Sequence, residues 1–169
     1  MSNQKVEELK VKVLEAQKNS DIASLYVLEE EAHKIFDEET LHGFYANILD
    51  LALEKLTDTL ESHRKMDMSE VQDFATTRAL YEYAMEHYSA GQIKDASALF
   101  EVLSGMTNDD KFSWSLKLHW LASAENITLD DFMSKMADIE VTQANKTFYI
   151  SGFTKAAQKL LDNAQTSGE

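Results

Sequence analysis

The feature that most constrains this chain is the complete absence of proline from its 169 residues. Proline breaks helix interiors because it lacks a backbone N–H and its ring clashes with the preceding turn. A proline-free chain therefore fits helices joined by short connections. The length suits one domain or a tight stack of helical repeats.

Apolar side chains recur at helical spacing along most of the sequence, and no segment gives a convincing strand or hairpin signal. We therefore expect an all-α fold of six to eight helices. The spacing predicts helices over residues 6–16, 22–36, 41–62, 69–89, 93–103, 112–124 and 142–164, with a short one starting at residue 128.

The clearest internal boundary lies in the segment "HRKMDMSEVQ". Its basic residues follow a helix C-terminus, where cations are favourable. The run from Ser69 to Gln72 matches the capping-box pattern that starts a helix. We predict an N-terminal helical region over residues 1–68 and a second region over residues 69–169, packed together as one compact unit.

The composition restricts the partners that the chain can bind. It has 30 acidic and 16 basic side chains, for a net charge of −14, which disfavours binding to nucleic-acid phosphates. No apolar run approaches the roughly 18 residues that span a bilayer, and no secretory signal is visible. The lack of cysteine excludes disulfides and thiolate metal sites. We expect a soluble, cytoplasmic protein with no membrane span.

The segment from residue 79 to residue 105 is rich in aromatic residues and has two apolar faces. At about 100° per residue, one face of its first helix holds Leu80, Tyr83, Ala84 and His87, and the other holds Tyr81, Met85 and Tyr88. The first face can pack on the helix that follows Gly91. The second face is either core or the lining of a groove for a partner, and the sequence leaves both hypotheses open.

The same segment carries the spacing of a tetratricopeptide repeat. Gly91, Ala96 and Phe100 have the offsets of the glycine, small and aromatic positions of such a repeat. Trp114 follows Leu80 by 34 residues, which is one repeat length. We expect tetratricopeptide-like helical hairpins after an N-terminal helical extension, with a degenerate second repeat.

The match is closest to one family. Residues 80–103 resemble the first repeat of the class II type III secretion chaperones, the translocator chaperones of Gram-negative bacteria. The family pattern is matched at Leu80, Tyr81, Tyr83, Ala84, Tyr88, Gly91, Ala96 and Phe100. The resemblance implies a concave groove that holds an extended segment of a secreted translocator. Carried over, it implies a groove lined by Tyr81, Met85, Tyr88, Phe112 and His119.

The chain also departs from that family. The family has three repeats after a short N-terminal region, whereas about 68 residues precede the match here and too few follow it for a complete three-repeat groove. This departure leaves open a divergent member, a related cochaperone or an unrelated helical adaptor.

Two Glu-x-x-His motifs are the main alternative to a binding function. They run from Glu30 to His33 and from Glu39 to His42, and such motifs supply ligands in ferritin-like di-iron bundles. Their offset would put them on opposite faces of a continuous helix. We predict no catalytic residues, no metal and no cofactor.

The sequence therefore predicts a non-enzymatic chaperone or adaptor that shields an apolar segment of a protein partner, such as a secreted translocator or effector. The alternatives are a helical-bundle enzyme with a carboxylate–His metal site and a self-associating structural subunit. A homodimer is left open, and the sequence does not identify the partner.

Overall fold

The computed structural model describes the backbone of residues 3–167 and the side chains of residues 3–164. This part of the chain contains ten α-helices, one π-helical turn and no strand, which confirms the all-α prediction. No helix within it is both long and apolar enough to cross a bilayer. The chain divides into two compact units, Met1–Ala79 and Leu80–Glu169, which are described separately.

The N-terminal unit contains α1 (Asn3–Lys18), α2 (Ile22–Val27), α3 (Glu29–Ile35), α4 (Glu38–Glu61) and the first half of α5 (Val71–Ser89). Asp21 caps α2 by accepting a hydrogen bond from the Ser24 N–H, and Asp37 caps α4 through the Thr40 N–H. The predicted helix over residues 22–36 is broken at Leu28. Three glutamates occupy the first turn of α3, where acidic side chains favour a helix start.

Buried side chains recur one turn apart along the helices of the N-terminal unit. Helix α1 buries Leu9, Val13 and Ala16 and packs against α2 and α3. Helix α4 buries a longer stripe, which consists of Phe44, Ile48, Ala52 and Leu56. This is the periodicity that predicted both helices.

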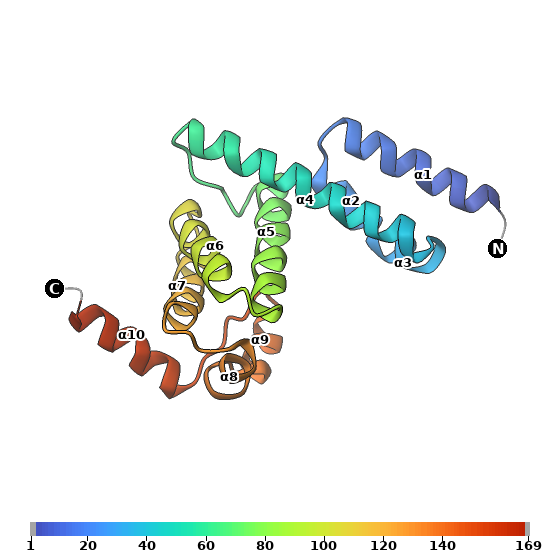
Figure 1. Ribbon diagram of the computed structural model, residues 1–169. Coiled ribbons are helices and arrows are strands. Elements are labelled where there is room, and N and C mark those ends of the chain that lie inside the picture. Colours follow the sequence, from blue (N-terminus) through green and yellow to red (C-terminus); the bar gives the residue numbers. More distant parts are fainter. Residues whose placement is uncertain (1–2, 168–169) are drawn as a thin grey trace. The chain divides into compact units, whose positions relative to one another are not determined.

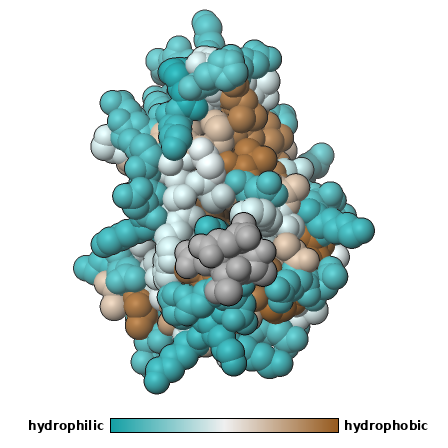
Figure 2. Space-filling model, turned by 90° about the vertical axis from the view of Figure 1, so that its left-hand side faces the viewer, coloured by the Kyte–Doolittle hydropathy of each residue, from teal (hydrophilic) through white to brown (hydrophobic). Residues whose placement is uncertain are grey.

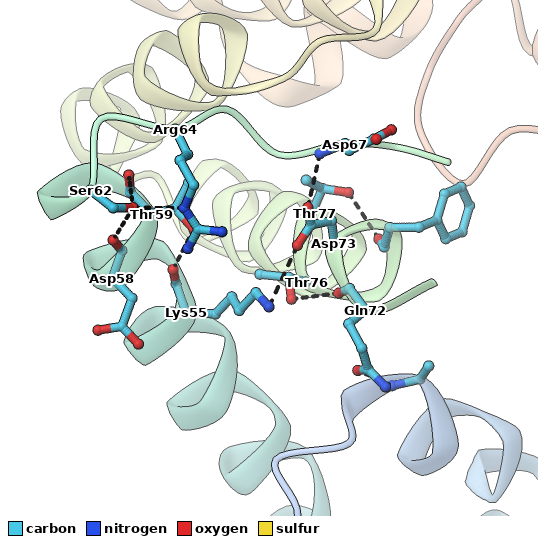
Figure 3. A network of polar contacts seen from close by, with 12 residues as sticks. Lys55, Asp58, Thr59, Ser62, Arg64, Asp67, Gln72, Asp73, Thr76 and Thr77 are labelled. Atoms are coloured by element: carbon cyan, nitrogen blue, oxygen red, sulfur yellow. Dashed lines mark hydrogen bonds and ion pairs between the residues drawn. The ribbon is translucent and has the colours of Figure 1, made fainter. Parts of the chain in front are cut away.

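A polar network holds the connection between α4 and α5 (Figure 3). The carboxylate of Asp73 accepts a hydrogen bond from the Asp67 N–H at 2.9 Å and lies 3.6 Å from the Lys55 ammonium group. Beside it, the Arg64 side chain donates from Nε to the Ser62 hydroxyl at 2.9 Å. The connection is therefore tied to both helices that it joins.

The boundary between the two units falls within α5, whereas the sequence predicted a boundary before that helix, between residues 68 and 69. The first half of α5 belongs to the N-terminal unit because its side chains bind residues at the starts of α2 and α3. The Gln72 amide donates to Asp21 at 2.5 Å, and the Arg78 guanidinium lies 3.2 Å from the Glu29 carboxylate.

The C-terminal unit contains the second half of α5, α6 (Ile93–Met106), α7 (Asp110–Ala124), α8 (Leu129–Asp131), the π-helical turn η1 (Phe132–Met136), α9 (Ile139–Asn145) and α10 (Lys155–Ser167). Gly91 forms the turn between α5 and α6 with a φ angle of 82°, a conformation that favours glycine. Helix α6 packs along α7, and α10 covers another part of α7 (Figure 1).

The predicted helix over residues 142–164 is wrong. Helix α9 ends at Asn145, because Lys146 adopts the left-handed conformation with a φ angle of 56°. The chain then runs to α10 without a helix (Figure 1). Thr147 to Ile150 are β-branched or aromatic residues, which have lower helix propensity than straight-chain ones.

Candidate functional site

Four of the five predicted groove residues lie in the interior of the C-terminal unit. The exposed fractions are 4% for Tyr81, 1% for Tyr88 and 0% for Phe112 and His119, while Met85 is half-buried. The expectation that this face of α5 is open to solvent is therefore not met at Tyr81 and Tyr88. Whether these residues bind a partner stays a prediction.

A segment of the same chain covers the predicted groove. The Phe148 ring lies 5.9 Å from the Tyr81 ring and 5.4 Å from the Phe112 ring, measured between centroids. The Tyr149 ring lies 4.6 Å from Phe112. These tilted and edge-to-face contacts are the arrangements that aromatic pairs prefer. The face that was predicted to receive an extended partner segment thus receives residues 148–150 of this chain.

A chain of hydrogen bonds joins that segment to α5 and α7. The Ile150 N–H donates to the Tyr81 hydroxyl at 3.1 Å, and this hydroxyl lies 2.8 Å from Nε2 of His119. Nδ1 of His119 lies 2.6 Å from the carbonyl oxygen of Ser115. A carbonyl can only accept, so Nδ1 carries the proton and Nε2 accepts from Tyr81. We call Tyr81, Phe112 and His119 the aromatic site.

Burial keeps the polar groups of the aromatic site neutral. It lowers the pKa of His119 to about 4 and raises the pKa of Tyr81 above its ordinary value. Both side chains are also almost inaccessible to solvent, so neither reaches a substrate in this conformation. The arrangement positions residues 148–150 and is not that of an exposed acid–base centre.

Tyr88 and Met85 lie outside this hydrogen-bond chain. The Tyr88 hydroxyl donates to the carbonyl of Ile127 at 2.5 Å, and its ring contacts Phe100 and Phe132. Tyr88 therefore fixes the turn after α7 and is a core residue. Met85 is the one predicted groove residue with a substantial part of its side chain at the surface.

The covering segment belongs to a loop that closes on itself. At its base, the Asp138 N–H donates to the Gly152 carbonyl at 2.8 Å, and Ala137 forms an isolated antiparallel bridge with Phe153. Inside it, the hydroxyl of Thr142 accepts from the N–H groups of Ser151 and Gly152 at 3.1 and 2.9 Å. We call residues 138–152 the closed loop.

Gly152 is required by the close approach at the base of the closed loop. A Cβ atom at this position would lie 2.5 Å from Cβ of Val141 and 2.7 Å from the Asp138 carbonyl oxygen. Both distances are shorter than side chains tolerate, and one neighbour is backbone. The requirement could not be foreseen from the sequence, because the contact joins residues that were assigned to one continuous helix.

The Glu-x-x-His motifs do not assemble a metal site in the part of the chain that the structure describes, where no group of three or more His, Asp or Glu side chains is placed to hold a metal ion. Nε2 of His33 lies 2.6 Å from the Tyr45 hydroxyl, which donates to Glu29 at 2.5 Å. Glu30 instead pairs with Lys34. The Glu29–Tyr45–His33 cluster could not be foreseen from spacing, because it joins α3 to α4.

Comparisons with protein-family models, with curated proteins and with solved structures find no match to this chain. The resemblance of residues 80–103 to the translocator chaperones therefore stays a hypothesis that depends on the residues quoted for it.

Proposed function

We propose that the protein is a non-enzymatic chaperone or adaptor that binds an apolar segment of a protein partner. The observation that carries this proposal is the occupant of the aromatic site. That site already holds a non-helical segment through two aromatic rings, Phe148 and Tyr149, and one backbone N–H, that of Ile150. Apolar pockets combined with main-chain hydrogen bonds are what recognition of an extended peptide requires.

Apolar side chains at the surface offer additional contacts. In Figure 2, apolar residues lie in patches between hydrophilic ones on the face shown. Exposed apolar patches mark interaction sites more often than isolated apolar residues do. Over the described residues, the large apolar side chains that are exposed are Val11, Leu14, Val27, Leu60, Val71, Phe74, Val102, Trp114, Ile139 and Val141.

The energetics favour a partner that makes more than two aromatic contacts. A buried aromatic side chain removes about 150–250 Å² from water. At about 25 cal/mol per Å², two rings contribute roughly 8–12 kcal/mol before costs. Association costs about 4–15 kcal/mol in lost freedom, so two rings alone give weak binding. Surface apolar residues would supply the remainder, and the acidic surface would keep the complex soluble.

The class of partner follows from the resemblance. We propose a secreted translocator or effector that is held in the cytoplasm before export, with its apolar segment shielded from nonspecific association.

A selection from displayed random peptides tests the proposal. The purified protein should enrich peptides that contain adjacent aromatic residues, and calorimetry should show that the synthetic peptides bind at one per chain. The Phe112→Ala variant, once shown to be folded, should lose this binding, whereas Val102→Ala at an exposed position of α6 should retain it. No enrichment by the folded protein would reject a peptide-binding function.

A further inference from the structure

The closed loop makes many of its hydrogen bonds internally. Its base is held by the Asp138–Gly152 pair, and Thr142 binds two of its backbone N–H groups. Nearer the tip, Ser151 accepts a hydrogen bond from Asn145 at 2.9 Å and lies 2.8 Å from the Thr147 hydroxyl. The loop can therefore keep its own structure without the helices that it covers.

The tip of the closed loop binds the helices mainly through its aromatic side chains. The rings of Phe148 and Tyr149 pack on the aromatic site, and the Ile150 N–H donates to Tyr81. Phe148 and Ile150 are only half-buried. Segments with few buried contacts open locally at a lower free energy than the whole domain.

We propose that the closed loop is a latch that opens as one body about its base, and that opening frees the aromatic site for an extended partner segment. The second part rests on the proposed function, and the first does not. Compact loops whose ends lie close together behave as units and are often functional. The latch keeps the apolar rings covered while no partner is bound.

The occupant defines the chemistry of the partner. Phe148, Tyr149 and Ile150 are consecutive, so the partner segment should carry two adjacent aromatic residues followed by a residue other than proline. The third residue must offer an N–H to the Tyr81 hydroxyl. The neutral surroundings exclude charged side chains from the two aromatic positions, since an unpaired buried charge is costly.

Amide hydrogen exchange tests the latch without any partner. The Ile150 N–H bonds to α5, whereas the Gly152 N–H bonds within the loop, so opening as one body exposes the first and not the second. We expect the Ile150 amide to exchange about 100-fold faster than the Gly152 amide, and the amides of α7 to exchange more slowly still. Equal rates at Ile150 and Gly152 would show that the loop opens by unfolding and would overturn the latch.

A peptide added in trans tests the freed site. The probe is a labelled synthetic peptide with the sequence of residues 146–154, and the readout is fluorescence anisotropy. Phe148→Ala weakens the latch, and Ile150→Pro is a second variant that keeps both rings and removes only the N–H. Either folded variant should bind the peptide at least about tenfold more tightly than the wild type does.

The control peptide carries alanine in place of both aromatic residues and should not bind. Folded variants that bind neither peptide would overturn the assignment of the partner chemistry. If the exchange experiment shows an opening latch but no displayed peptide is enriched by the protein, the proposed function fails and the latch stands.

Discussion

The hydroxyl of Tyr81 lies 2.8 Å from Nε2 of His119, and this pair connects α5 to α7 in the interior of the C-terminal unit. The same hydroxyl accepts the Ile150 N–H, so one oxygen atom holds two helices and the tip of the latch. Because His119 is bound on both ring nitrogens, its orientation and tautomer are fixed.

Replacing Tyr81 with Phe tests this connection. The variant keeps the ring but leaves Nε2 of His119 and the Ile150 N–H without their partner. A buried polar group without a partner costs about 1–3 kcal/mol, so urea unfolding should show a loss of this size. Tyr83→Phe is the matched control, because Tyr83 is on the same helix and half-buried, and it should change stability by less than about 0.5 kcal/mol. Equal losses in both variants would contradict the assignment.

The stability of the protein should depend on pH through His119. Its pKa is about 4 in the folded protein and about 6.5 when unfolded, so the unfolded chain binds more protons between these values. The stabilisation is complete above about pH 6.5 and is lost as the pH falls towards 4, by about 3 kcal/mol in total.

Urea unfolding at several pH values measures this loss. The pKa values of the capping residues Asp21 and Asp37 are also lowered, but from 3.8, so their contribution is lost in a more acidic window. The variant His119→Gln should flatten the profile between pH 4 and 6.5. A profile that keeps its slope in this variant would assign the pH dependence to other groups.

The helical pattern of the sequence predicted much of this fold, because helix formation is largely a matter of local periodicity and capping. Helix α4, the turn at Gly91 and the caps at Asp21 and Asp37 all follow from signals within a few residues. The closed loop does not. It depends on Gly152 meeting Val141 and on Tyr81 meeting Ile150, and such contacts between distant residues leave no periodic signature.

The candidate site shows the same limit. The two apolar faces of α5 could be read from the spacing of Leu80, Ala84, Tyr81 and Tyr88, but periodicity alone cannot say what covers the second face. The run from Phe148 to Ile150 was assigned to a helix, so its role as that cover could not be foreseen.

The two glycines Gly152 and Gly43 should respond in opposite ways to alanine. Gly152→Ala forces a clash with Val141 and Asp138 and should cost about 1–3 kcal/mol, as overpacking does. Gly43 lies on an exposed part of α4, where an added Cβ atom would meet nothing within 4 Å, so Gly43→Ala should stabilise by about 0.5–1 kcal/mol. Thermal unfolding compares them, and a neutral Gly152→Ala would show that the base of the loop is not tightly packed.

Truncation of Tyr88 should be severe. Its ring is 1% exposed and its hydroxyl binds the Ile127 carbonyl, so Tyr88→Ala should cost about 3–5 kcal/mol, the range for large aromatic truncations. Met85→Ala, one turn away and half-buried, should cost clearly less. Similar losses in denaturant unfolding would mean that Met85 is as much a core residue as Tyr88.

The replacement of the latch tip by a partner segment on the aromatic site is tested most directly by amide exchange. The exchange of the Ile150 and Gly152 N–H groups is measured in the presence of a saturating peptide from the display selection. We predict that the peptide removes the protection of the Ile150 amide, because Tyr81 accepts from the peptide instead, while the Gly152 amide stays protected by Thr142. A bound peptide that leaves the Ile150 amide as protected as before would bind elsewhere and would contradict this replacement.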